Sequence, residues 1–197
     1  MSQFIESIKV EDQKAFLLDL HQQRVRETFA HFRKECSIDL EKIFKDLEHD
    51  EDGLYKLRIV YDLEGNFKSQ MLPYAFPEIE TFELVENNDF SYDFKFADRT
   101  EFEKMKKKAR AQEIIIVKNG QITDTSFSNL LFLKNQTWYT PKNFLLNGVQ
   151  RQNLLKQGII KETEINLQNL NEFSHFQLIN SMNEFNQDFV YSIEELK

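Results

Sequence analysis

An Asn-Gly pair between two apolar runs constrains the fold of this chain more than any other feature. Asn119-Gly120 follows the run at residues 113–117 and precedes a second run that begins at Gln121 and reaches Leu133. Asn and Gly adopt the positive φ angles of a two-residue hairpin turn, so the pattern predicts two antiparallel strands. The N-terminal part is expected to form a strand over residues 4–10 and then two helices, and further strands are expected on both sides of the hairpin. This order predicts an α+β fold and not a doubly wound parallel sheet.

The composition is that of a folded protein, and the length fits one large domain or two small subdomains. The chain has 197 residues, of which 41% are hydrophobic and 29% are charged. The polar run at residues 86–89 predicts a boundary between a small subdomain over residues 1–88 and a larger one over residues 89–197.

The charge and the apolar runs narrow the classes of partner. A net charge of -8 argues against a nucleic-acid partner. No apolar run approaches the ~20 residues of a membrane span, and the first residues lack the layout of a signal peptide, so we expect no membrane association. Cys36 is the only cysteine. We therefore expect a cytoplasmic protein without an internal disulfide.

Lys95 is the candidate catalytic residue. It lies between Phe94 and Phe96 in a predicted strand over residues 92–96. If its amine is desolvated, the ammonium loses its proton more readily and becomes a nucleophile toward carbonyl carbons. If the lysine instead lies on the exposed face of the strand, it has no such role.

Other polar groups could bind an anion, although each also has a purely structural interpretation. Asp124 lies among hydroxyl side chains in the predicted hairpin and could be a hydrogen-bonded turn residue. Gly148-Val149-Gln150 precedes a predicted helix, whose free amides and dipole favour phosphate. Ser181 adds one hydroxyl. Arg24 projects from a predicted helix over residues 20–34, where composition favours an exposed arginine.

Taken in order, these groups resemble the class IV aminotransferase family, the fold type IV pyridoxal-phosphate enzymes. The motifs that carry the resemblance are Lys95-x-x-x-Arg99, Ile122-Thr-Asp124-Thr-Ser-Phe-Ser-Asn129-Leu, Tyr139-Thr-Pro141 and Leu146-Asn-Gly148-Val-Gln-Arg151. Upstream, Phe4-Ile-Glu6-Ser-Ile and His21-Gln-Gln-Arg24 are similar to the family's Phe-Glu-Thr strand and His-x-x-Arg helix. The resemblance implies pyridoxal 5'-phosphate as cofactor, a small amino-acid-like substrate, a homodimer and a β-barrel-like larger subdomain.

The resemblance also implies a role for each group. Lys95 would bind the cofactor's aldehyde and shuttle protons, and Asp124 would pair with the pyridine nitrogen in place of the family's glutamate. The phosphate would be held by Arg24, by the Gly148 loop with the amides of Val149 and Gln150, and by Ser181. Aspartate is shorter than glutamate by one methylene, and Gln150 stands where the family has threonine. The turns that precede the family's first strand are missing, so we expect part of the substrate pocket to be absent or rebuilt.

Three functions are compatible with these motifs. A lyase that converts aminodeoxychorismate into p-aminobenzoate and pyruvate is favoured, because Lys95-x-x-x-Arg99 resembles the lyase pattern. An aminotransferase for branched-chain or D-amino acids is the first alternative. The second is a degenerate, non-catalytic relative, which the short N-terminus, Asp124 and Gln150 would explain.

Overall fold

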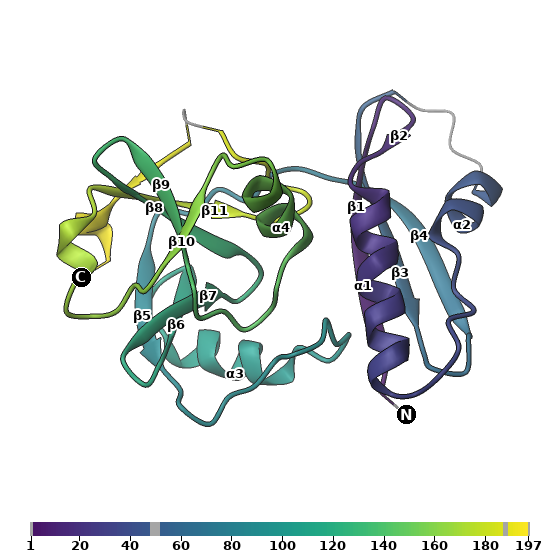
Figure 1. Cartoon of the computed structure of the whole chain (residues 1–197), viewed down its shortest axis with the longest axis horizontal. Coiled ribbons are helices and arrows are strands. Elements are labelled where there is room, and N and C mark those ends of the chain that lie inside the picture. The colour runs from purple at the N-terminus through teal and green to yellow at the C-terminus, as the bar shows by residue number, and fades with distance from the viewer. Residues whose placement is uncertain (1, 48–51, 187–188, 197) are drawn as a thin grey trace. The chain divides into compact units, whose positions relative to one another are not determined.

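The computed structural model describes residues 2–47, 52–186 and 189–196, which form two compact units (Figure 1). Unit 1 comprises Met1–Phe76 and Phe94–Asp98, and unit 2 comprises Pro77–Asp93 and Arg99–Lys197. The sequence predicts one boundary at residues 88 and 89, whereas the packing divides the chain after Phe76 and returns a later segment to unit 1. The reason is that the rings of that segment, Phe94 and Phe96, pack against the core of unit 1.

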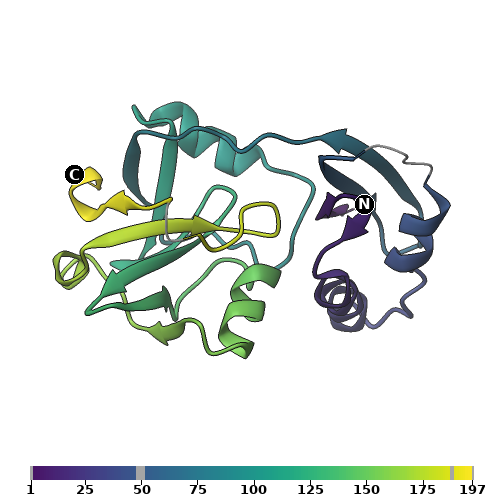
Figure 2. The ribbon, with the colours of Figure 1, turned by 90° about the horizontal axis from the view of Figure 1, so that it is seen from above.

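Unit 1 is an antiparallel sheet with two helices on one face (Figure 2). The strand order is β2-β1-β3-β4. Its elements are β1 (Phe4–Glu11), β2 (Lys14–Ala15), α1 (Leu18–His31), α2 (Leu40–Asp46), β3 (Leu54–Tyr61) and β4 (Phe67–Pro73). Alternate residues of β1 and β3 point to the helices, as their period of two predicts. The core they form contains Phe4, Ile8, Val10, Val25, Phe29, Ile38, Leu40, Ile43, Leu57, Ile59 and Tyr61.

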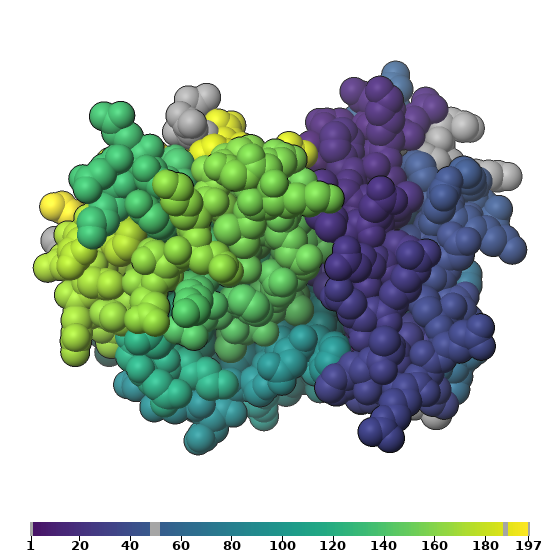
Figure 3. All heavy atoms as spheres, viewed as in Figure 1, coloured from purple at the N-terminus to yellow at the C-terminus, as the bar shows by residue number. Residues whose placement is uncertain are grey.

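The two helices of unit 1 begin in different ways. Asp39 caps α2, since its side chain accepts a hydrogen bond from Lys42 N at 3.0 Å. The sequence predicts that Asp19 caps the first helix, but α1 begins at Leu18, after Leu17 in a left-handed conformation (φ 53). Asp19 lies in the first turn, where its negative charge interacts favourably with the positive end of the helix dipole. The surface of α1 is visible in purple in Figure 3.

Unit 2 contains two sheets, with strand orders β5-β6-β7 and β10-β9-β8-β11-β12. The first has β5 (Phe82–Glu86), β6 (Glu113–Lys118) and β7 (Gln121–Thr125). The second has β8 (Asn129–Lys134), β9 (Thr137–Pro141), β10 (Lys161–Thr163), β11 (His175–Ile179) and β12 (Tyr191–Ser192). The helical elements are α3 (Thr100–Lys108), α4 (Val149–Lys156) and the 3-10 turns η1 (Leu170–Glu172) and η2 (Ile193–Glu195). This mixture of helices and largely antiparallel sheets confirms the α+β fold class.

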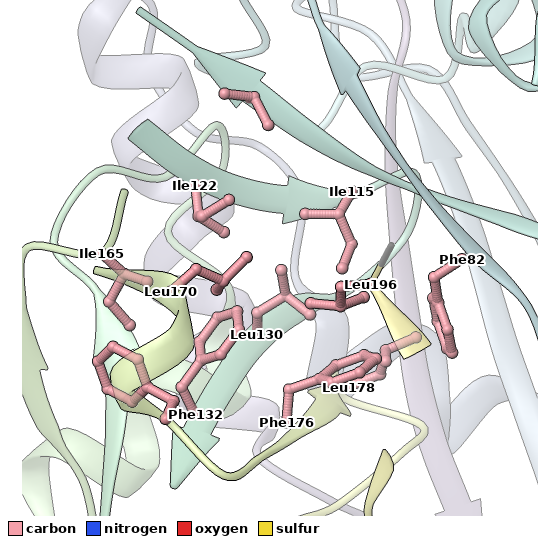
Figure 4. Close-up of a cluster of buried hydrophobic side chains, with 12 residues drawn as sticks. Phe82, Ile115, Ile122, Leu130, Phe132, Ile165, Leu170, Phe176, Leu178 and Leu196 are labelled. Carbon is pink, nitrogen blue, oxygen red and sulfur yellow. The ribbon is translucent and has the colours of Figure 1, made fainter. Parts of the chain in front are cut away.

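The predicted hairpin is confirmed in unit 2. Asn119 and Gly120 have φ angles of 50° and 73°, and Lys118 pairs with Gln121 across the turn. Behind the hairpin, Ile115 and Ile122 join the apolar core shown in Figure 4. The other sheet contributes further large side chains to the same cluster, including Leu130, Phe132, Phe176 and Leu178. Each fully buried side chain of this size stabilises the fold by roughly 1.5–3 kcal/mol.

Candidate active site

The segment that carries Lys95 bends sharply, so the predicted strand over residues 92–96 is wrong. Phe96 N donates to Phe94 O at 2.8 Å, which makes Lys95 the middle residue of a three-residue turn. Only Phe96 forms an isolated bridge, with Phe4. Lys95 O accepts a hydrogen bond from Ile5 N at 2.9 Å, so the turn is attached to β1. The Lys95 side chain is half-buried.

Next to this attachment, β1 and α1 enclose a cluster of three polar side chains, which we call the Glu6 cluster: Glu6, His21 and Arg24. Arg24 Nε donates to Glu6 Oε1 at 2.9 Å and Arg24 Nη2 donates to Glu6 Oε2 at 2.5 Å. His21 Nδ1 lies 2.6 Å from Glu6 Oε2. Glu6 and His21 are completely buried and Arg24 is 8% exposed. Composition favours an exposed Arg24, and that expectation is wrong because the ion pair with Glu6 allows the charge to be buried.

The cluster has a defined charge state at neutral pH. Burial raises the pKa of Glu6, but the charge of Arg24 and the hydrogen bonds from His21 and Arg24 outweigh it and lower the pKa to about 2. Burial lowers the pKa of His21, and the charges of Arg24 and Lys95 lower it further, against the opposing effect of Glu6. His21 is therefore neutral, and its Nδ1–H donates to the Glu6 carboxylate. Among the described residues, His21 Nε2 has no hydrogen-bond partner.

In unit 2, Asp124 anchors the loop that leads into α4. Asp124 Oδ2 accepts hydrogen bonds from Leu145 N and Leu146 N, both at 2.9 Å. Asp124 Oδ1 accepts one from Asn129 Nδ2 at 2.8 Å, and the same amide donates to Leu146 O. The carboxyl group is therefore hydrogen-bonded as its structural interpretation predicts, and it fixes the path of the chain just before Gly148.

The Asp124 carboxyl titrates close to neutral pH. Burial raises its pKa to about 6, although the donors from Leu146, Asn129 and Leu145 and the charge of Arg151 oppose this rise. A raised folded-state pKa gives stability that is fully present below the unfolded pKa of 3.8 and is lost as the pH rises through 6.

An Asp124→Asn variant should lack this dependence on pH. We expect the difference in unfolding free energy between wild type and variant to change by about 1 kcal/mol from pH 5 to pH 7, in favour of the variant. Urea unfolding at both pH values measures it. A difference that is the same at pH 5 and pH 7 would show that the carboxyl does not titrate in this range.

Gly148 lies where the chain approaches Asn129 most closely. A Cβ atom at Gly148 would lie 2.1 Å from Asn129 Oδ1, although the φ angle of -65° suits any residue. Helix α4 starts directly afterwards, and its first intrahelical donor is Gln152 N, which bonds Gly148 O at 3.0 Å. The amides of Val149 and Gln150 come before that donor, so they belong to the unpaired first turn that favours an anion.

Ser181 lies in a turn that is bonded to Ser128, directly before β8. The Asn180 side chain accepts hydrogen bonds from Met182 N and Asn183 N, both at 2.8 Å, and donates to Ser128 Oγ at 2.8 Å. Unit 2 thus connects the Asp124, Gly148 and Ser181 segments through Asn129 and Asn180.

Arg99 supports the turn that follows β7. Its guanidinium donates to Ser126 O and, at 3.3 Å, to Tyr92 Oη, and it lies 4.0 Å from the centroid of the Phe102 ring. The sequence predicts a capping box of Thr100 with Glu103, but the N-cap of α3 is Arg99, whose side chain makes no capping hydrogen bond. The arginine that follows Lys95 in the motif therefore stabilises the turn beyond Asp124.

The predicted site residues are divided between the two units. Unit 1 holds Arg24 and Lys95, and unit 2 holds Asp124, Gly148, Val149, Gln150 and Ser181. The sequence interpretation assigned no role to Glu6, His21 or Asn129. The sequence contains an indication that Glu6 and its partners form a buried polar cluster. Glu6 shares the buried face of β1 with Phe4 and Ile8, and a carboxylate at such a position requires a buried cation.

Residues 3–186 match the family described as amino-transferase class IV. The chain belongs to the class IV aminotransferase family. Members of this family are pyridoxal phosphate-dependent enzymes that act on small, amino-acid-like molecules, and the predicted fold class and cofactor are confirmed at this level. The segments of the Glu6 cluster, Lys95, Asp124 and Gly148 all lie within the matched range.

The alignments with similar proteins cover almost the whole of this chain. An uncharacterized protein of Haemophilus influenzae is 30% identical over 187 residues, which cover 93% of this chain and 99% of the relative. A crystal structure of a proposed 4-amino-4-deoxychorismate lyase from Haemophilus somnus 129pt is 34% identical, with a TM-score of 0.86, and the match covers 94% of this chain and 98% of that one. A proposed amino-acid aminotransferase from Mesorhizobium loti shares the fold at 17% identity, with a TM-score of 0.80 and coverage of 93% and 97%.

Proposed function

We propose that this class IV aminotransferase family member is a lyase that converts aminodeoxychorismate into p-aminobenzoate and pyruvate, with pyridoxal phosphate bound at Lys95. The observation that carries the proposal is the similarity to the Haemophilus somnus structure, at 34% identity over 94% of this chain. The spacing of Lys95 and Arg99, which resembles the lyase pattern, supports it.

The residues fit the chemistry of the cofactor. Arg24 is a nearly buried cation, and the amides of Val149 and Gln150 start a helix, so both suit a phosphate dianion. A carboxylate has about four acceptor positions. Asp124 uses three of them within the chain, which leaves one for the pyridine nitrogen. Ser181 would add a hydroxyl donor to the phosphate.

The reaction assigns successive tasks to Lys95. When bound, pyridoxal phosphate supplies a ring that accepts electrons from the carbon bearing the substrate's amine. Lys95 would first bind the cofactor's aldehyde and, once the substrate's amine takes its place, would remove the proton from that carbon. Loss of pyruvate then leaves an aromatic ring. Asp124 would keep the pyridine nitrogen protonated, and Arg24 would hold the phosphate in place.

Product formation tests the lyase directly. The purified protein is incubated with pyridoxal phosphate and aminodeoxychorismate, and p-aminobenzoate is quantified against a Lys95→Ala control. We expect p-aminobenzoate from the wild type alone. Equal amounts from both proteins would refute the lyase assignment.

An aminotransferase is the second candidate, because the matched family carries that activity in its description. Such an enzyme would convert its bound cofactor to the amine form when an amino acid is added, without aminodeoxychorismate. Absorbance spectra recorded after addition of branched-chain or D-amino acids would reveal this conversion. A protein that gains no visible absorption band with pyridoxal phosphate would instead be a non-catalytic relative.

We also propose that the enzyme is a homodimer in the cytoplasm. The dimer is implied by the resemblance to the class IV family, and the single cysteine, Cys36, suits a reducing compartment. Light scattering coupled to size exclusion would give a mass of about twice the 23.6 kDa chain.

Gly148 provides a test of the phosphate loop. In a Gly148→Ala variant the new methyl group would displace the Asn129 amide, which holds both Asp124 and Leu146. We expect a loss of roughly 1–3 kcal/mol in unfolding free energy and weaker binding of pyridoxal phosphate. Thermal unfolding and a binding titration measure the two effects.

The matched control is Gly158→Ala, at the end of α4. Gly158 has a φ angle of +70° and no heavy atom within 4 Å of an added Cβ, so alanine there brings backbone strain of about 1 kcal/mol without a clash. This control should bind the cofactor as the wild type does. Wild-type affinity in Gly148→Ala would contradict the assigned role of the loop.

A further inference from the structure

We propose that Glu6 and His21 are positioning residues that hold the Arg24 guanidinium in the orientation in which it binds the phosphate of pyridoxal phosphate. This inference rests on the proposed function, in which Arg24 contacts that phosphate. It adds two residues of unit 1 that would act through Arg24 without touching the cofactor's phosphate themselves.

The hydrogen bonds around Glu6 fix the orientation of the Arg24 guanidinium. Arg24 Nε and Nη2 each meet a different oxygen of Glu6, at 2.9 and 2.5 Å, so the plane of the guanidinium is held at two points. His21 Nδ1 holds the carboxylate in turn, 2.6 Å from Oε2. Glu6 engages two of the five N–H donors of an arginine, and the fork geometry of the guanidinium then sets the direction of the others.

Arg24 is the one residue of the Glu6 cluster whose side chain is exposed to solvent. The Arg24 side chain is 10% exposed, whereas the side chains of Glu6 and His21 are fully buried. A ligand can therefore reach the cluster through Arg24 and not through the other two residues. The charge of Lys95 also acts on His21, which places the proposed catalytic amine in the electrostatic neighbourhood of the cluster. The group that would bind the aldehyde and the group that would bind the phosphate thus share one part of unit 1.

A purely structural role is the competing interpretation, in which the cluster only ties α1 to β1. Well-packed apolar side chains usually serve that purpose as well as a buried ion pair does, or better. A structural tie predicts that variants lose affinity for all ligands in parallel with stability. A positioning role predicts a selective loss of affinity for the phosphate, which is the readout of the experiment.

The experiment compares pyridoxal phosphate with pyridoxal, which lacks the phosphate. Dissociation constants for both are measured by absorbance titration in the wild type and in the variants Glu6→Gln, His21→Leu and His21→Asn. Gln cannot accept both guanidinium bonds, and Leu removes the donor to Glu6. Asn restores that donor, because its amide nitrogen occupies the place of Nδ1. We expect the preference for the phosphorylated form to fall roughly 10–100-fold in Glu6→Gln and His21→Leu, and to return to within about 3-fold of the wild type in His21→Asn.

The control is Glu11→Gln, which removes a carboxylate from the same strand. Glu11 pairs with Lys9 at 2.8 Å and its side chain is 42% exposed, so the phosphate preference should not change. Folding of each variant is checked by circular dichroism. An unchanged phosphate preference in folded Glu6→Gln and His21→Leu would overturn the inference. If the wild type itself failed to bind pyridoxal phosphate, the proposed function would fail instead.

A measurement on the wild type decides the matter if the variants do not fold. The ¹⁵N resonances of the histidines are followed while inorganic phosphate is added. Phosphate bound at Arg24 should shift the Nδ1 resonance of His21, because the two residues share the Glu6 carboxylate. No shift of that resonance at saturating phosphate, in a protein that binds pyridoxal phosphate, would overturn the inference.

Discussion

A Lys95→Ala variant is expected to retain no pyridoxyl group after incubation with pyridoxal phosphate and reduction with borohydride. In the wild type the reduction should fix one pyridoxyl group on Lys95, which mass spectrometry of the digested protein would locate. Because the same amine is the proposed proton carrier, the variant should also lose roughly 10²–10⁴-fold in turnover. This is the largest effect that we expect on activity.

The control for Lys95 is Lys118→Ala in unit 2. Lys118 is also half-buried, and its ammonium donates to Phe90 O at 2.7 Å. It should incorporate the pyridoxyl group at Lys95 as the wild type does. A modified peptide that contains any other lysine would remove the basis for the proposed mechanism.

The largest effect on stability is expected from Glu6→Ala. The variant would leave the Arg24 guanidinium without its carboxylate in a nearly sealed site, where Arg24 is 8% exposed. Breaking a buried ion pair from one side costs about 3–5 kcal/mol in unfolding free energy. Urea unfolding at pH 7 measures this loss. Glu11→Ala, on the same strand and in an exposed pair, should lose less than about 1 kcal/mol, and equal losses in the two variants would refute the role of burial.

The same carboxylate makes the stability of the wild type depend on acid. The pKa of Glu6 falls from 4.5 to about 2 on folding, so its contribution is present above pH 4.5 and is lost as the pH falls toward 2. The fall corresponds to about 3 kcal/mol. His21 also makes the protein less stable in acid. Its pKa is lowered on folding, so its contribution to stability is present above pH 6.5 and is lost as the pH falls. The advantage of the wild type over Glu6→Ala should therefore shrink between pH 5 and pH 3.

The sequence predicts local structure well where one residue type has one conformational use. Asn119-Gly120 marks a turn because these two residues tolerate positive φ, and Gly158 ends α4 in a left-handed conformation (φ 70) for the same reason. Asp39 caps α2 through its own side chain. In each case the information lies within four residues of the feature, so no tertiary contact is needed to predict it.

Two of the predictions that failed depend on contacts between distant segments. Arg24 is buried because Glu6, 18 positions earlier, offers both carboxylate oxygens. Residues 92–96 bend because Lys95 O and Ala97 N bond the beginning of the chain at Ile5 and Gln3. Periodicity cannot reveal such partners, since it reports which face of an element is apolar and not what lies opposite. Asp124 is an intermediate case, because its hydroxyl-rich neighbourhood indicates hydrogen bonding but not which amides donate.

The return of Phe94–Asp98 to unit 1 has a consequence for how the protein is made. Phe4 is covered by Phe94 and Phe96, with ring centroids 6.3 and 5.3 Å from its own. A ribosome that has released only the first 76 residues has not yet supplied these rings, so the nascent small unit exposes one end of its apolar interior. Lys95 lies between these two rings in the sequence, so it is synthesised together with them. The last segment to complete the core of unit 1 therefore also carries Lys95, the proposed catalytic residue, and a fragment cut after Phe76 would lack both the two rings and this lysine.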